Sequence, residues 1–79
     1  MNIKDLPNGR VINDHEEVWY LNGQLHRVDG PAIIYLTGAV VGKEWYLYGR
    51  RHREDGPAIT DRNGGQEWYL NGVSIGNKA

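Results

Sequence analysis

The chain has 79 residues and no cysteine, and nine Lys and Arg nearly balance ten Asp and Glu, which gives a net charge of -1. A chain of this length forms one domain, and the missing cysteines exclude a disulfide framework and a thiolate metal site. No apolar run approaches the roughly 18 residues of a membrane span, and the balanced charge provides no overall basic field for nucleic acid. We therefore expect a cytoplasmic protein without membrane contact. Eleven glycines and three prolines, with no helical apolar period, favour strands and turns.

The N-terminal segment, up to about residue 17, is interpreted as a degenerate unit of a repeat. Asp5 and Pro7 stand in it where Asp55 and Pro57 stand in a later copy.

The repeat itself is centred on Trp19, Trp45 and Trp68, at spacings of 26 and 23 residues. Internal repeats of this length predict a stack of supersecondary units. We expect one repeat domain over residues 1–79. Its units are expected at about 1–17 (degenerate), 18–43, 44–66 and 67–79 (truncated).

Each unit is predicted to begin with a β-hairpin. The Trp-Tyr-Leu segment is rich in strand-forming residues, and alternation puts Trp45 and Leu47 on one face of the strand. Asn22-Gly23 and Asn71-Gly72 favour type I′ turns, because both residues tolerate positive φ. The middle unit has Tyr48-Gly49 at this place.

Asp-Gly-Pro, at 29–31 and again at 55–57, then ends the second strand, because proline cannot donate to a strand ladder. A short strand is expected after each, at 32–36 and 58–60. The predicted fold class is therefore all-β: an antiparallel meander of tandem β-hairpin repeats, with roughly eight or nine short strands. The three tryptophans and the tyrosines beside them are expected to form a ladder that serves as the core.

The repeated segment resembles the MORN-like tandem repeat with the signature W-Y-x-N-G-x-x-H-R-x-D-G-P-A, found in phage, viral and bacterial proteins. The resemblance covers about residues 17–76, with VWYLNGQLHRVDGPA and EWYLYGRRHREDGPA as two near-complete copies. The third copy has Ile75 where the histidine would fall. The resemblance implies a structural or interaction module with no shared chemistry.

The repeated His-Arg-x-Asp segment, at 26–29 and 52–55, has three interpretations. It could form a metal site, or a His/Asp acid-base pair. It could instead be structural, with Asp accepting from turn amides, His donating to a neighbouring strand and Arg covering an aromatic face. We favour the structural interpretation and expect no catalytic residue, no metal and no cofactor, because no independent nucleophile accompanies either copy.

The middle hairpin departs from the other copies at Tyr48, Arg50 and Arg51. With Arg53, these residues predict a basic, aromatic binding patch of the kind enriched at protein interfaces, although a solvated hairpin or a phosphate contact would use the same residues. A second candidate contact is the apolar loop with Val40 and Val41, which could equally pack back on the core.

Together these features predict a small non-enzymatic protein-binding module. The resemblance extends the expectation to a phage-encoded inhibitor of a host protein, of the anti-defence or anti-CRISPR type, acting in the host cytoplasm. A homodimer is also expected, because a chain this short has little stability to spare. The alternatives are a sequestering protein for a nucleotide-like ligand, a module that contacts nucleic acid, and a His/Asp hydrolase.

Overall fold

The computed structural model describes residues 8–37 and 41–78, which form ten strands and no helix. Their bounds are β1 (Gly9–Ile12), β2 (Glu16–Leu21), β3 (Gln24–Leu25), β4 (Ile33–Tyr35), β5 (Val41–Glu44), β6 (Tyr46–Leu47), β7 (Arg50–Arg51), β8 (Ile59–Asp61), β9 (Gln66–Leu70) and β10 (Val73–Lys78). The predicted all-β class is confirmed. Ten strands replace the expected eight or nine in part because the middle tryptophan strand is interrupted at Trp45, where its pairing partner changes.

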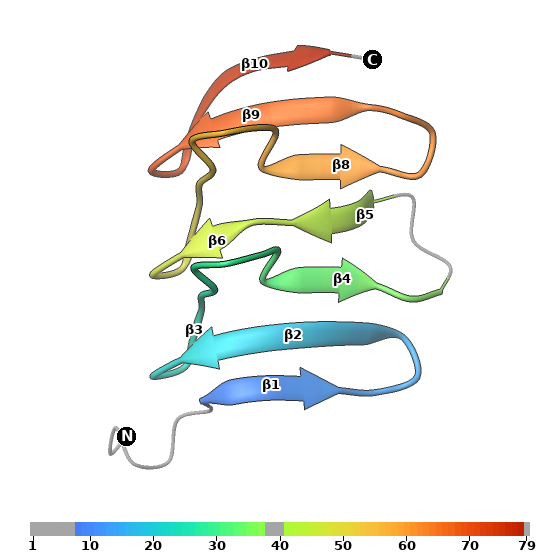
Figure 1. Ribbon diagram of the computed structural model, residues 1–79, viewed down its shortest axis with the longest axis vertical. Coiled ribbons are helices and arrows are strands. Elements are labelled where there is room, and N and C mark those ends of the chain that lie inside the picture. The colour runs from blue at the N-terminus through green and yellow to red at the C-terminus, as the bar shows by residue number, and fades with distance from the viewer. Residues whose placement is uncertain (1–7, 38–40, 79) are drawn as a thin grey trace.

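The strands form a continuous antiparallel stack. Seven of them follow one another across one sheet in the order β1-β2-β4-β5-β8-β9-β10, β3 pairs with β2, and β6 and β7 form a small second sheet. Figure 1 shows the stack rising along the long axis of the molecule, with the two ends of the chain at opposite ends of the stack. The body measures 41 × 28 × 20 Å, so the fold is elongated along the stacking direction.

Backbone hydrogen bonds also join one hairpin to the next. Arg27 donates its amide to the carbonyl of Tyr46 at 3.1 Å, and Gly49 donates to Leu25 at 2.8 Å. One hairpin further along, Gly72 donates to Arg51 at 2.8 Å. Backbone groups at the edge of one hairpin therefore form hydrogen bonds with the next hairpin. These bonds pair backbone donors and acceptors that short strands would otherwise leave without a partner.

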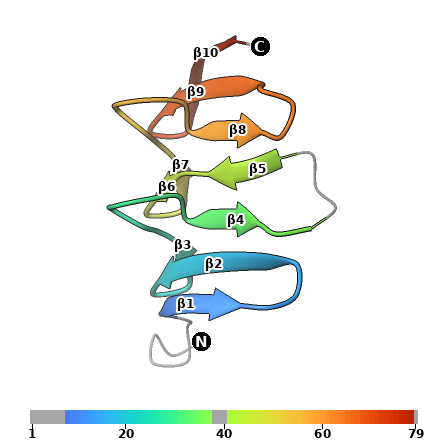
Figure 2. The same cartoon turned by 45° about the vertical axis from the view of Figure 1, so that its right-hand side comes forward.

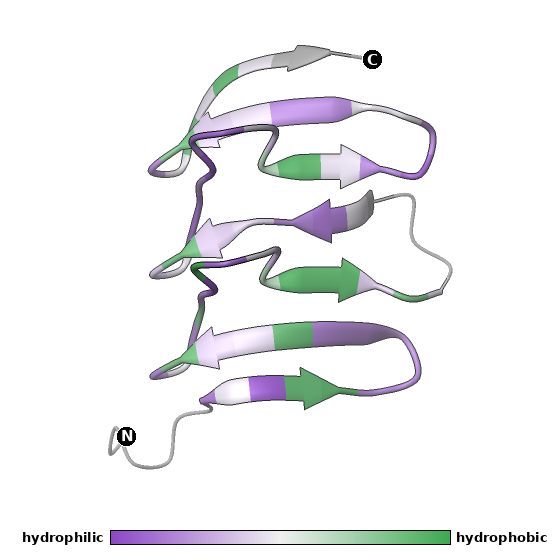
Figure 3. Cartoon of the chain, viewed as in Figure 1, coloured by the Kyte–Doolittle hydropathy of each residue, from purple (hydrophilic) through white to green (hydrophobic). Residues whose placement is uncertain are grey.

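Two loops, residues 26–32 and 52–58, carry the chain from one hairpin to the next strand of the large sheet; we call them the DGP loops. Figure 2 shows both projecting to the same side of the stack. They are mostly hydrophilic, whereas β4 between them is apolar over most of its length (Figure 3). The loops thus form one polar margin of the molecule.

The buried apolar side chains are small or β-branched: Val18, Ala32, Ile33, Ala58 and Ile59. The three tryptophans are only half-buried. The most buried apolar side chains therefore lie on β2, β4 and β8 and at the ends of the two DGP loops. A core formed by an aromatic ladder stays a prediction.

The large sheet ends in one strand on each side, β1 on one and β10 on the other. β1 pairs with β2 from Gly9 to Ile12, and β10 pairs with β9 from Val73 to Lys78. Apolar side chains are exposed on both, Val11 and Ile12 on β1 and Val73 and Ile75 on β10. Asp5 and Pro7, aligned above with the second DGP loop, lie outside the described residues.

All three hairpin turns have the same backbone geometry. Their first central residues, Asn22, Tyr48 and Asn71, have φ of 49°, 49° and 50°, and the glycine that follows each also has positive φ. Positive φ at both central positions is what a type I′ turn requires. Tyr48 thus adopts a conformation that suits asparagine and strains a bulky side chain.

Tyr48→Asn should therefore stabilise the fold. We expect a gain of about 1 kcal/mol in the free energy of unfolding, or about 5 °C in Tm, because the left-handed strain is removed. Thermal and denaturant unfolding measure it, and Asn71→Tyr is the matched control, with a loss of similar size. A lower Tm for Tyr48→Asn would contradict the assignment of strain to this turn.

Candidate functional site

The histidine of each motif copy joins two successive hairpins. The Nδ1 atom of His26 accepts from the backbone amide of Tyr48 at 2.9 Å, and Nδ1 of His52 accepts from the amide of Asn71 at 3.0 Å. Each histidine therefore binds the turn of the following hairpin as an acceptor, not as the donor expected from the sequence. An accepting Nδ1 requires that the proton of the neutral ring lies on Nε2.

The first turn finds the same kind of acceptor in a different residue. Asn8 precedes β1, and its side-chain oxygen accepts from the amide of Asn22 at 2.8 Å. A side-chain acceptor thus faces the amide of the first central residue in each of the turns at Asn22, Tyr48 and Asn71.

The arginine of each copy covers the tryptophan of its own hairpin. The guanidinium carbon lies 3.9 Å from the ring centroid for Arg27 over Trp19 and 4.0 Å for Arg53 over Trp45, which confirms the predicted aromatic contact. Arg27 also donates to Asp29 and to the carbonyl of Pro31.

The second copy repeats these bonds. Arg53 donates to Asp55 at 3.1 Å and to the carbonyl of Pro57 at 3.2 Å. In both copies the aspartate thus accepts from the arginine side chain of its own loop. Through these contacts the arginine of each copy holds its own DGP loop together and covers the tryptophan ring of its hairpin.

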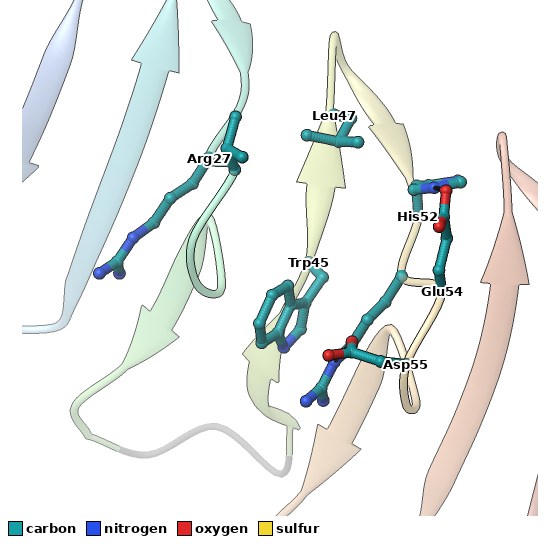
Figure 4. A pocket seen from close by; sticks show the side chains of 8 residues that line it. Arg27, Trp45, Leu47, His52, Glu54 and Asp55 are labelled. Carbon is teal, nitrogen blue, oxygen red and sulfur yellow. Dashed lines mark hydrogen bonds and ion pairs between the residues drawn. The ribbon is translucent and has the colours of Figure 1, made fainter.

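A groove of about 380 Å³ lies between the two DGP loops. Trp45 and Leu47 form its floor, Arg27 and Val28 line one side, and residues 52–55 line the other. Figure 4 shows Trp45 and Leu47 between Arg27 and the His52, Glu54 and Asp55 side chains. His52 Nε2 lies 3.5 Å from a Glu54 carboxylate oxygen. We call this cavity the loop groove; its floor is apolar and its rim carries both signs of charge.

The hairpin tips lie on the same side of the stack as the DGP loops, at the left of the view in Figure 1. Tyr48 is 63% exposed at the middle tip, and its ring lies 4.4 Å from that of His26. A cavity of about 330 Å³, which we call the tip cavity, is lined by Tyr46, Gly49, Arg50, Arg51 and Gly72. The structure thus brings the predicted Tyr48, Arg50 and Arg51 to one margin.

Behind the tip cavity, Glu44 is buried, with a side chain only 7% exposed. Its carboxylate accepts from the hydroxyl of Tyr35 at 2.7 Å, the hydroxyl of Tyr46 at 3.0 Å and Nε of Arg51 at 3.2 Å. We call these four residues the Glu44 cluster. Burial, the hydrogen bond to Glu44 and its negative charge raise the pKa of Tyr35 well above its ordinary value.

The structure separates the other predicted binding residues from the middle tip. Arg53 lies over Trp45 and lines the loop groove. Val41 begins β5, where its backbone pairs with Asp61, and Val40 lies outside the described residues.

Sequence reasoning missed Glu44 and Tyr35. Glu44 directly precedes its tryptophan, at the position that Val18 occupies in the first copy and Glu67 in the third. The comparison between copies therefore does not single out Glu44.

No protein-family model, curated protein or solved structure matches this chain. Among residues 8–37 and 41–78, no helix has the length and apolarity that crossing a membrane requires. Within the same residues, His, Asp and Glu side chains form no group of three or more that could hold a metal ion.

Replacing His52 should test its role as an acceptor. His52→Ala removes the partner of the Asn71 amide and should lower the free energy of unfolding by about 1 to 2 kcal/mol. His52→Asn should recover part of the loss, because Asn8 performs this role for Asn22. Denaturant unfolding distinguishes them; equal losses would show that the ring matters only through packing.

The Glu44 cluster should make stability sensitive to alkaline pH. The raised pKa of Tyr35 means that the folded state holds this phenol proton more tightly than the unfolded chain does. Its contribution is complete below about pH 10 and is lost as the pH rises above that value.

Tyr35→Phe should therefore flatten the fall in unfolding free energy above about pH 10. Tyr20→Phe, which leaves the Glu44 cluster intact, should keep the steeper dependence. Urea unfolding across this pH range measures both slopes. Identical slopes for wild type and Tyr35→Phe would contradict the assignment.

Proposed function

We propose that this chain is a small non-enzymatic module that binds a protein partner through its middle tip. The observation that carries the proposal is the strained Tyr48. It is exposed and has φ of 49°, at a position where both other turns have asparagine.

Local strain of this kind persists where function requires it. Asparagine would satisfy the turn at lower cost, so stability does not account for the tyrosine. A tyrosine beside arginine is a combination enriched at the energetic centres of protein interfaces. Arg50 is exposed on β7 two residues along the chain, which supplies that neighbour.

The contacts of the repeated motif support a non-enzymatic role. Nδ1 of His26 and Nδ1 of His52 accept from backbone amides, and both arginines are held by aspartate and a carbonyl oxygen. A general base needs a ring nitrogen with a free lone pair. In each copy Nδ1 uses its lone pair for a turn amide, and Nε2 of the neutral ring then carries the proton.

The resemblance to MORN-like repeats extends the proposal to a phage-encoded inhibitor of a host defence protein, such as an anti-CRISPR protein, acting in the host cytoplasm. The outer edges of β1 and β10, which have no strand partner among the described residues, support the expected homodimer.

A second candidate function is sequestration of a small, nucleotide-like ligand. The loop groove favours it, because an indole floor of this kind can stack on a base and arginines line both sides. A nucleotide that raises Tm, and fails to do so for Trp45→Leu, would support this alternative.

A pull-down from bacterial lysate, with the eluate identified by mass spectrometry, tests the proposal. Wild-type chain should capture a protein in stoichiometric amount, and Tyr48→Asn should lose it while gaining stability. Val28→Ser is the matched control, because Val28 is exposed and lines the loop groove but not the tip cavity. Capture that survives Tyr48→Asn, or that Val28→Ser abolishes equally, would contradict binding through the middle tip.

A further inference from the structure

The Glu44 cluster occurs only in the middle hairpin, although the first hairpin has the same pairing. Leu25 lies opposite Tyr20 across the first hairpin as Arg51 lies opposite Tyr46 across the middle one. Val18 and Glu44 each directly precede a tryptophan and each pair with Ile33, from opposite sides. The chain thus places Val and Leu in one copy where it places Glu and Arg in the next.

The stack does not need a charged pair at these positions. Burying the carboxylate of Glu44 costs several kcal/mol of desolvation, and apolar residues of similar size often serve stability as well or better. The first hairpin shows which apolar residues fit. Stability therefore does not explain why Glu44 and Arg51 occur together. A role of Glu44 in orienting the Arg51 side chain does.

Arg51 is held from three directions. Its Nε donates to Glu44 at 3.2 Å, and its guanidinium carbon lies 5.9 Å from the ring centroid of Tyr46 and 5.4 Å from that of Tyr69. The side chain is still 41% exposed and lines the tip cavity. An arginine that is already oriented loses little entropy when it binds an anion.

The remaining walls of the tip cavity suit an anionic group. Arg50 also lines it, and among the described residues no carboxylate does. The Gln24 side chain lies against Gly49 and the stem of Arg50 lies against Gly72, so the two arginines are the polar groups that the cavity presents. The negative charge of Glu44 offsets the positive charge of Arg51. The charge of Arg50 is not offset in this way, so the tip cavity has a net positive charge.

We propose that the tip cavity is a carboxylate-binding site, in which Arg51, oriented by buried Glu44, and Arg50 receive an acidic side chain of the protein partner. This rests on the proposed function and names the partner's chemistry: an acidic segment that contacts the middle tip beside Tyr48. Arginine suits this task because its planar fork binds a carboxylate through two parallel hydrogen bonds.

The charge distribution favours a protein carboxylate over a nucleic acid. Recognition of a phosphate backbone uses about six or more basic contacts along a strip. The tip cavity presents two basic side chains, Arg50 and Arg51, and Arg27 and Arg53 are held in the DGP loops. Two arginines at one cavity match a single acidic side chain.

A hexaglutamate peptide, titrated into isotope-labelled chain and followed by NMR, tests the site without the natural partner. The backbone amides of Gly49 and Gly72 and the Nε–H groups of Arg50 and Arg51 should shift together and saturate, while hexaglutamine leaves them unchanged. Inorganic phosphate and a short thymidine oligonucleotide, titrated in parallel, distinguish other anions.

Two variants make the result specific. Glu44→Val/Arg51→Leu copies the first hairpin, so it should fold and bind the peptide about tenfold or more weakly. Arg50→Gln should weaken binding with no effect on the fold. Arg10→Gln, an exposed arginine on β1, is the charge-matched control and should bind as wild type.

Hexaglutamate that binds no better than hexaglutamine, or that binds the Glu44→Val/Arg51→Leu variant as well as wild type, would overturn the proposal. Tighter binding of the oligonucleotide, or of phosphate alone, would also overturn it. The pull-down separates the two claims: a partner lost with Tyr48→Asn but kept by Glu44→Val/Arg51→Leu leaves the proposed function standing and removes the carboxylate site.

Discussion

The second and third tryptophan hairpins are each joined to the one before by the amide of the first turn residue, which donates to a histidine ring; in the first hairpin the same amide donates to Asn8, which precedes β1. The first central residue of each of these turns has positive φ. His26 and His52 supply ring nitrogens at 2.9 and 3.0 Å, and Asn8 supplies an amide oxygen at 2.8 Å. Two further backbone bonds complete each junction. The turn residues are exposed, so these bonds contribute by tying one hairpin to the next and not by satisfying a buried donor.

This constraint determines which residues are free to bind a partner. In each motif copy the histidine binds the next turn, while the arginine, aspartate and proline close a DGP loop over a tryptophan. Function is then left to positions where the copies differ and the side chain reaches solvent. Tyr48 differs from the other copies and is exposed, although its positive φ strains the backbone. Arg51 also differs and is partly exposed, and it is held by the buried carboxylate of Glu44, which has no counterpart in the first hairpin. Both lie at the middle tip.

The fold class, the turns and the arginine–tryptophan contacts could be predicted from the sequence, because local signals encode them: Asn-Gly pairs, Asp-Gly-Pro breaks and alternating strand formers. The identity of the buried residues could not, since the burial of Ala32 and Ala58 depends on the path of the DGP loops. The burial of Glu44 was equally hidden, because an isolated glutamate is ordinarily solvent-exposed. Its partners Tyr35 and Arg51 come from a neighbouring strand and from the returning strand of the same hairpin, which the local sequence around Glu44 does not show.

The central claim is that the repeated His-Arg-x-Asp motif is architectural. Long-range ¹⁵N correlation spectra of the histidine rings at neutral pH test it most directly. The account predicts that His26 and His52 are both protonated on Nε2, with Nδ1 showing a hydrogen-bond coupling to the amides of Tyr48 and Asn71 respectively. A proton on Nδ1 of either ring, or no coupling to the following turn, would contradict it and return the motif to the candidates for chemistry.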